Sequence, residues 1–285
     1  MAFYSSWDTH VHLFDPVHFP FAEDRSYTPG AAGIDELLLA MEEGAIDRAV
    51  LVQPSVYGND NRCLLAALDV LGDRARGVAV ADAAALRRDS EIAEMQARGV
   101  RGFRVNLVSG GAALGGSEAL SAMASALAGS GMFLQIYAPI DTVLAHLDTI
   151  TRAEVPVVLD HFAGIGAEAD EGQLTDLMRR TASGQVWIKM SADYKLAADR
   201  ERARVRAMSL IKSCVALRPD HVIWGSDWPH TGGGGARGSR PFGEIEPFRN
   251  ADSHAIPGLF PACGLGEPEI RKIMCDNPAR LLDPV

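Results

Sequence analysis

The sequence predicts an α/β protein of the (β/α)8, or TIM, barrel class, folded as a single domain. Eight short runs rich in apolar and β-branched residues recur along the 285-residue chain, and most are followed by a segment with helical spacing. No change of composition marks a domain boundary. Near-continuous apolar strands that alternate with helices form parallel sheets covered on both faces, and eight such units favour a closed barrel over an open sheet.

The predicted strands are short, and several end in polar residues. The first contains His10 and His12, and the last contains Asp227. In chain order the eight strands are residues 7–14, 48–56, 76–82, 100–108, 132–139, 155–163, 185–192 and 221–230.

Amphipathic segments connect these strands. The first begins after Gly33 and ends at Gly44, as a capped helix does. Apolar residues at helical spacing predict further helices at 61–72, 119–131 and 202–217, and a closing helix at 267–282.

One segment departs from this rhythm. Residues 231–260 are rich in glycine and proline and are long for a connection between a strand and a helix. We expect a loop insertion after the last strand, within a barrel that spans 1–285. It is either a flexible surface insertion or a lid, because it leaves directly from a strand end.

Composition excludes several classes of partner. With a net charge of −10, the chain lacks the basic surface that nucleic acid or an anionic membrane requires. A small anionic substrate stays compatible, because a site can be locally basic. We see no signal peptide and no apolar run long enough to span a bilayer. The four cysteines form no CxxC pair, which predicts reduced thiols in a cytoplasmic protein.

Polar residues at the strand ends predict an active site, because barrels of this class carry theirs at the carboxyl ends of the strands. His10 and His12 are two residues apart and share one side of the first strand. His161 follows the sixth apolar run, and Asp227 lies in the eighth. Each has an ordinary structural explanation alone, as a hydrogen-bonded histidine or a helix cap. Together they can form a metal site with an open position, or a metal-free site in which Asp227 takes a proton from water while the histidines polarise a carbonyl.

Two positive residues indicate what binds there. Arg104 lies on a strand that faces the core, where a charge is costly without an anion. The anion is either a substrate carboxylate, which arginine matches with two parallel hydrogen bonds, or an internal carboxylate. Lys195, after the seventh strand, is either a second positive group of the site or a solvent-exposed lysine.

Several motifs together resemble one known family. The chain is similar to the amidohydrolase superfamily, in the branch that includes 2-pyrone-4,6-dicarboxylate lactonase and related sugar-lactone hydrolases and isomerases. The resemblance spans Trp7 to Leu282. It rests on the order and spacing of DTHVHLFDP, RSYTP, QPSVYGNDN, GFRVNL, LDHFAG, GSDWPH and DNPARLL.

The resemblance implies a hydrolase that opens the lactone ring of a small carboxylated compound. Asp227 would activate water, and the three histidines would polarise the carbonyl, directly or through one metal ion. The residues implied to bind the substrate are Arg104, Tyr27, Ser55 and Tyr137, with Lys195 and Arg25 as additional positive groups.

The resemblance leaves two alternatives for a cofactor. Either none is required, or one divalent ion, preferably zinc, is bound by His10, His12, His161 and Asp227. Many superfamily members hold two metals through a bridging lysine on the fourth strand and a histidine on the fifth. These strands carry Arg104, Asn106, Gln135 and Tyr137 instead, so a two-metal site is not expected.

Other functions stay open on the same scaffold. A lactone isomerase would use similar residues, and a nonoxidative decarboxylase would need a firmly bound metal. A catalytically silent binding protein would keep Arg104 but would not need Asp227 beside three histidines. Barrels of this size often pair, which leaves a homodimer open.

Overall fold

The chain folds around one parallel sheet. The computed structural model describes residues 5–87, 89–108, 116–182, 185–233, 241 and 243–283. The sheet has eight strands in the order β1-β3-β4-β5-β6-β7-β8-β9, each pairing with its neighbour in parallel. Their bounds, which overlap the eight predicted ranges, are β1 Trp7–Val11, β3 Arg48–Val52, β4 Ala75–Ala79, β5 Val100–Asn106, β6 Phe133–Tyr137, β7 Val157–Leu159, β8 Val186–Met190 and β9 Val222–Trp224.

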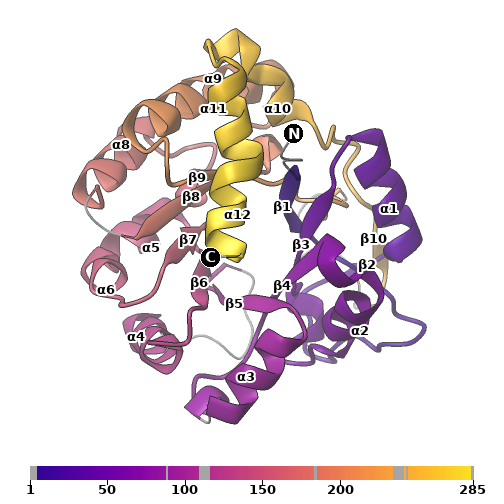
Figure 1. Cartoon of the computed structure of the whole chain (residues 1–285). Coiled ribbons are helices and arrows are strands. Elements are labelled where there is room, and N and C mark those ends of the chain that lie inside the picture. The colour runs from indigo at the N-terminus through magenta and orange to yellow at the C-terminus, as the bar shows by residue number, and fades with distance from the viewer. Residues whose placement is uncertain are drawn as a thin grey trace.

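The two ends of the sheet meet and close it. Val11, at the end of β1, forms a parallel bridge with Trp228, which follows β9. The amide of His12 donates to the carbonyl of Trp228 at 2.8 Å, and the amide of Asp227 donates to the carbonyl of His10 at 2.9 Å. The predicted (β/α)8 barrel is therefore confirmed, with helices surrounding the strands (Figure 1).

Helices connect the strands much as predicted. The segments predicted at 33–44, 61–72 and 202–217 form α1, α2 and α9, and the closing segment forms α11, a π-helical turn (Lys272–Asp276) and α12 in succession. In the described part of the chain, no helix is long and apolar enough to cross a membrane. The helix bounds are α1 Ile34–Glu43, α2 Arg62–Leu71, α3 Asp89–Ala97, α4 Gly116–Leu127, α5 Ile140–Ala145, α6 Leu147–Thr151, α7 Asp160–Gly164, α8 Glu171–Arg180, α9 Arg200–Leu217, α10 Ala255–Leu259, α11 Glu267–Arg271 and α12 Asn277–Leu282.

The C-terminal helix covers the end of the barrel where the strands begin (Figure 1). Leu281 and Leu282 of α12 pack into the apolar cluster inside the barrel. Beyond them, the carboxylate of Asp283 accepts hydrogen bonds from Arg48 and Arg76, each at 2.7 Å. Because these arginines lie near the starts of β3 and β4, this end is closed, and a ligand must enter at the carboxyl ends of the strands.

The alternation of β8 shows which side chains face inward. Ile188 and Met190 belong to the core packed outside the barrel, whereas Trp187 belongs to the inner cluster. Lys189 shares the inward face with Trp187, since side chains alternate along a strand. A barrel interior is normally filled by apolar side chains. A buried lysine at this depth is therefore a departure that needs partners.

The segment after β9 forms a second, two-stranded sheet with the loop that follows β1. Its strand β10 (Ile245–Glu246) pairs in parallel with β2 (Thr28–Pro29). The buried Glu246 carboxylate accepts a hydrogen bond from the amide of Gly232 at 2.6 Å. Residues 234–240 and 242 of the predicted insertion lie outside the described residues, and its role as an insertion or a lid stays a prediction.

Candidate active site

The residues predicted to carry chemistry meet where the barrel closes. His10 lies in β1, and His12 follows that strand directly. The sixth and eighth predicted strands were too long, because β7 ends at Leu159 and β9 at Trp224. After each of these two strands the backbone turns sharply. His161 and Asp227 have φ angles of 52° and 65°, in the left-handed region that costs about 1–2 kcal/mol for a residue other than glycine.

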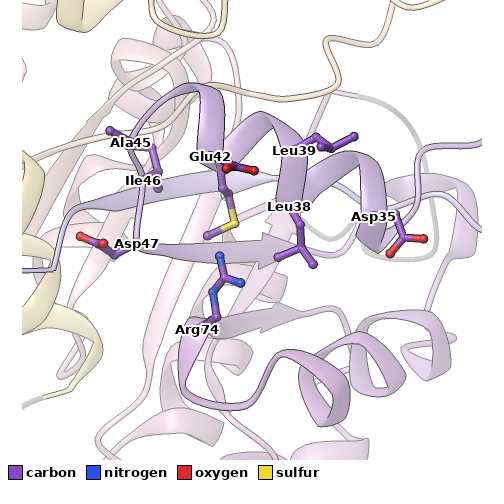
Figure 2. Close-up of a pocket in the computed structure, with 9 residues that line it drawn as sticks. Asp35, Leu38, Leu39, Glu42, Ala45, Ile46, Asp47 and Arg74 are labelled. Carbon is purple, nitrogen blue, oxygen red and sulfur yellow. The ribbon is translucent and has the colours of Figure 1, made fainter.

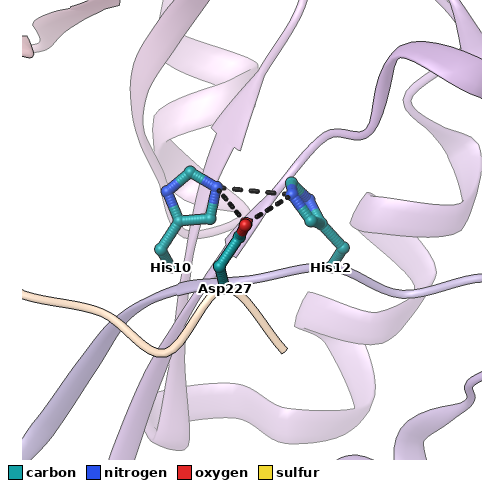
Figure 3. A group of neighbouring side chains, drawn as sticks. All are labelled: His10, His12 and Asp227. Atoms are coloured by element: carbon teal, nitrogen blue, oxygen red, sulfur yellow. Dashed lines mark hydrogen bonds and ion pairs between the residues drawn. The ribbon is translucent and has the colours of Figure 1, made fainter. Parts of the chain in front are cut away.

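These turns place Asp227 against three imidazoles. Its Oδ1 lies 3.4 Å from His10 Nε2 and 3.5 Å from His12 Nε2. Its Oδ2 lies 4.0 Å from His161 Nε2. Figure 3 shows His10, His12 and Asp227 converging, with the two histidine Nε2 atoms 3.3 Å apart. All four side chains are buried.

Asp227 is held as an anion by its neighbours. Burial alone would raise its pKa, but the charge of Lys195 and the nearby His161, His12 and His10 outweigh burial and hold its pKa well below the ordinary 3.8. Lys195 Nζ lies 3.5 Å from Oδ2, which also accepts a hydrogen bond from Tyr194 Oη. At neutral pH Asp227 is therefore ionised. It accepts a proton only during a reaction, when charge develops on another group in the site.

Two of the imidazoles beside it, His10 and His161, are neutral. Burial, together with the charge of Lys189, lowers the pKa of His10 to about 3. Burial and the charge of Lys195 hold the pKa of His161 well below its ordinary value. His161 Nδ1 is 2.7 Å from the hydroxyl of Ser191, which orients its ring. Neutral imidazoles can donate or accept one hydrogen bond at each nitrogen, or bind a metal.

A second charged layer lies beneath this site, and we call it the floor network. Asp160 Oδ2 accepts hydrogen bonds from Arg104 at 3.1–3.2 Å and from Gln135 Nε2 at 3.0 Å. Lys189 Nζ lies 3.1 Å from Asp160 Oδ1, 2.9 Å from Gln135 Oε1 and 3.2 Å from His10 Nδ1. The floor network consists of these five residues, His10, Arg104, Gln135, Asp160 and Lys189, each at most 4% exposed.

Arg104 thus has an internal anion, one of the two explanations its sequence position allowed. Burial would raise the pKa of Asp160, but Lys189, His10 and Arg104 outweigh burial and keep its pKa well below the ordinary value. Arg104 also lines the cavity above, where its guanidinium lies 5.1 Å from the ring centre of Tyr137. Its position therefore serves both the floor network and the cavity.

The cavity opens above Asp227 and has a volume of about 260 Å³. It brings together most of the residues predicted for the site, but His10 and Arg25 do not contribute to its described lining. The Arg25 guanidinium instead donates to Ala22 O and Thr28 Oγ1, both at 2.9 Å. The lining residues are His12, Tyr27, Pro54, Ser55, Arg104, Asn106, Tyr137, His161, Lys195, Asp227, Thr231, Gly232 and Arg249.

The charge of this lining is positive although the chain is acidic. Arg104, Lys195 and Arg249 face a cavity in which Asp227 is the sole carboxylate among the described lining residues. Lys195 Nζ is 3.3 Å from Tyr137 Oη, and the Arg249 guanidinium lies 5.1 Å from the ring centre of Tyr194. This surplus of positive charge favours a small anionic ligand.

A larger hollow, of about 690 Å³, lies on the outside of the barrel (Figure 2). Its described lining, along α1 and around Arg74, contains Leu38, Leu39, Glu42 and Asp47 but no histidine. It therefore lacks the groups gathered above Asp227, and we place the candidate active site in the smaller cavity.

Sequence reasoning missed four residues of the site. Asp160 adjoins His161 but was not singled out, and Tyr194 adjoins Lys195. Lys189 had a detectable signal, since it is a lone charge at an inward position of an apolar strand. Arg249 lies in the predicted insertion, more than twenty residues after Asp227, and no local pattern marks it.

The donor atoms fit one divalent metal ion. His10 Nε2, His12 Nε2 and a carboxylate oxygen of Asp227 lie within 4.8 Å of one another, and so do donor atoms of His10, Asp160 and His161. Two imidazoles and one carboxylate with an open position are a typical zinc set. Asp160, however, already pairs with Lys189 and Arg104, so the set that contains Asp227 fits better.

A closed parallel barrel with imidazoles and an ionised carboxylate at its strand ends is the architecture of a barrel enzyme. The sequence profile of the amidohydrolase family matches residues 7–283, and the chain belongs to that family. It is 31% identical to a 4-sulfomuconolactone hydrolase from Rhizobium radiobacter, over 97% of this chain and 89% of the relative.

Two further comparisons agree. The chain is 29% identical to a 2-pyrone-4,6-dicarboxylate hydrolase from Comamonas testosteroni, over 97% of this chain and 90% of the relative. The crystal structure of a candidate 2-pyrone-4,6-dicarboxylic acid hydrolase from Pseudomonas putida superposes with a TM-score of 0.79 at 26% identity, covering 98% of both chains.

Proposed function

We propose that this protein is a lactonase that hydrolyses the ring ester of a small anionic lactone. The observation that carries the proposal is the ionised Asp227 held against neutral imidazoles at the base of a cavity with a surplus of positive charge. The two curated relatives described above, a 4-sulfomuconolactone hydrolase and a 2-pyrone-4,6-dicarboxylate hydrolase, support this substrate class.

The reaction assigns a task to each group. The substrate's anionic group lies against Arg104, with Tyr27, Ser55, Tyr137 and Lys195 around the ring. Asp227 accepts a proton as water attacks the ring carbonyl, and it returns that proton to the ring oxygen as the carbonyl carbon–ring oxygen bond breaks. The ring oxygen leaves as a hydroxyl, and the new carboxylic acid ionises and releases a proton to solvent. His10 and His161 stabilise the oxyanion that develops on the carbonyl oxygen, and His12, 3.3 Å from His10, orients that ring.

The same site either needs no cofactor or holds one divalent ion, zinc first. His10, His12 and Asp227, with His161 beside them, would hold it, and it would polarise the carbonyl when bound. We also propose that the enzyme is cytoplasmic and that its partner is its substrate, rather than nucleic acid or a membrane. Pairing of the barrels as a homodimer stays open. The net charge of −10 supports the exclusion of nucleic acid.

The test is proton release from a panel of lactones that carry one carboxylate, two carboxylates or a sulfonate. Protein is used as purified, after treatment with a chelator, and after addition of zinc. We expect acid release with at least one dianionic lactone, and release that survives chelation would establish a metal-free hydrolase. Conversion without acid release would identify an isomerase, and loss of carbon dioxide a decarboxylase. No conversion of any lactone would contradict the proposal.

A further inference from the structure

Lys189 is a buried cation directly below the donor set that fits a metal. Its side chain is 1% exposed, and its ammonium contacts Asp160, Gln135 and His10. An ammonium has only donors, so the nitrogen of His10 that faces it must act as an acceptor. The Lys189 contact, at 3.2 Å to His10 Nδ1, therefore places the proton of the neutral imidazole on Nε2.

The side-chain amide of Gln135 supports this direction of donation. Its Nε2 donates to Asp160 Oδ2 at 3.0 Å, so its Oε1 faces Lys189 Nζ at 2.9 Å. A carbonyl oxygen only accepts, and Lys189 therefore donates to Gln135 as well. Asp160 Oδ1 forms no hydrogen bond among the described residues: its 3.4 Å contact with His10 Nδ1 is longer than its 3.1 Å ion pair with Lys189.

The contact between the two histidines leads to the same arrangement independently. His12 Nδ1 lies 2.7 Å from the carbonyl of Val52, which can only accept, so Nδ1 carries a proton, and in a ring with one proton Nε2 is bare. That bare Nε2 lies 3.3 Å from His10 Nε2. Two bare nitrogens at this distance would repel each other, whereas a proton on His10 Nε2 gives a donor and an acceptor.

A metal at the His10, His12 and Asp227 set needs the opposite arrangement. Metal coordination uses an unprotonated imidazole nitrogen. His10 Nε2 could bind only if its proton moved to Nδ1, toward the ammonium that donates there. The positive charge of Lys189 opposes the metal as well, because its nearby carboxylate, Asp160, is shared with Arg104.

We propose that Lys189 is the resident cation of this site: it holds His10 with its proton on Nε2, aimed at Asp227 and His12, and thereby selects against a divalent metal ion. Lys189 is thus a positioning residue for His10. The inference concerns the same site as the proposed function, but it does not rest on that reaction, because it is tested without substrate.

The first experiment measures zinc affinity of metal-free protein by competition with a fluorescent chelator. The variant is Lys189→Met, which keeps the length of the side chain and removes its charge and donors. The matched control is Lys195→Met, which removes a cation that lies only 3.5 Å from Asp227 Oδ2. We expect Lys189→Met to bind zinc about 10- to 100-fold more tightly than the wild type, the range typical of groups that orient a metal ligand.

The control separates orientation of His10 from removal of charge. If charge alone decides, Lys195→Met gains as much zinc affinity as Lys189→Met, because Lys195 is the cation closer to a ligand oxygen. Equal gains, a larger gain for Lys195→Met, or a wild type that binds zinc as tightly as Lys189→Met would each overturn the proposal.

A second measurement needs no variant at Lys189 and stands even if Lys189→Met does not fold. Nitrogen NMR of ¹⁵N-histidine-labelled, metal-free wild-type protein reports which ring nitrogen carries the proton, with His10→Gln identifying the His10 signals. We expect the proton on Nε2 of His10 and on Nδ1 of His12. A His10 proton on Nδ1 would overturn the proposal, whatever the enzyme does with lactones.

Discussion

Two layers of charge lie one above the other in this barrel, and they are built differently. In the floor network, Asp160 has Arg104 and Lys189 within 3.2 Å, and its exposure is 1%. In the layer above, the Lys195 side chain is 32% exposed and its nearest polar contacts, to Tyr137 and Asp227, are 3.3 and 3.5 Å. Arg249 is exposed at the mouth of the cavity.

This difference shows that the buried and the exposed charges of the site have different functions. The charged groups of the floor network are buried, and each lies within 3.2 Å of a partner in the network, so the network sets a fixed field and a fixed orientation for His10. The upper cations are held loosely and meet water, so an anionic ligand can replace that water. Changes in the floor network should therefore act on stability and on His10, whereas changes above should act on ligand affinity.

The largest effect is expected from Asp227→Asn, which keeps the shape of the side chain but removes the proton acceptor. Turnover should fall by about 10²- to 10⁴-fold, the usual contribution of a general base, while KM changes little because Arg104 and Lys195 are intact. The measurement is proton release at saturating lactone. A variant that keeps more than a few per cent of wild-type kcat would refute the assignment.

Asp160→Asn should produce the largest loss of stability, because it leaves Arg104 and Lys189 buried without their anion. We expect the free energy of unfolding at pH 7 to fall by about 3–5 kcal/mol. The pKa of Asp160 is depressed in the folded protein, so this stabilisation is complete above the ordinary pKa of 3.8 and is lost as the pH falls below it.

Denaturant titrations of the wild type and Asp160→Asn over a series of pH values check the sign. The difference between the two proteins should narrow below pH 3.8. A difference that stays constant or widens in acid would show that the Asp160 carboxylate is not stabilised as an ion.

Gly225→Ala should have an intermediate effect, because it separates the two ends of the sheet. A Cβ at Gly225 would lie 2.5 Å from His10 Cβ and 2.7 Å from His10 N. We expect a loss of about 1–3 kcal/mol of stability from the overpacking, with lower kcat as His10 moves away from Asp227. Gly258→Ala is the control, since its added Cβ meets nothing within 4 Å. Equal melting temperatures and activities for the two variants would contradict this account of the closure.

The smallest effect is expected from Arg249→Met in the upper layer. An exposed cation that contacts an anionic ligand contributes about 1 kcal/mol, so KM should rise about fivefold with kcat nearly unchanged. Arg25→Met provides the comparison, because Arg25 was predicted for the site but lies outside the described cavity lining. A KM increase confined to Arg25→Met would assign substrate contact to Arg25 and remove it from Arg249.

The strands and much of the candidate site could be predicted because their signals are local. Apolar runs and helical spacing identify the units of the barrel, and polar residues that directly follow a run point to its carboxyl end. His12, His161 and Asp227 were found in this way, and the structure places all three on one cavity. The ends of β7 and β9 were not predicted. Each strand is followed by a left-handed residue, His161 or Asp227, and the sequence signals such a conformation only where the residue is glycine.

By itself, then, the sequence determined the eight-stranded barrel and the kinds of group at its carboxyl end, since both follow from patterns within a few residues. The tertiary structure decided which charges satisfy one another. Lys189 meets His10 across 179 positions of chain, and Arg104 meets Asp160 across 56. Such pairs depend on strand register and on closure of the sheet, which arise only when every strand has taken its place. For that reason, the position of the proton on His10, and whether Lys189 or a metal ion supplies the positive charge beside it, are decided by the tertiary structure.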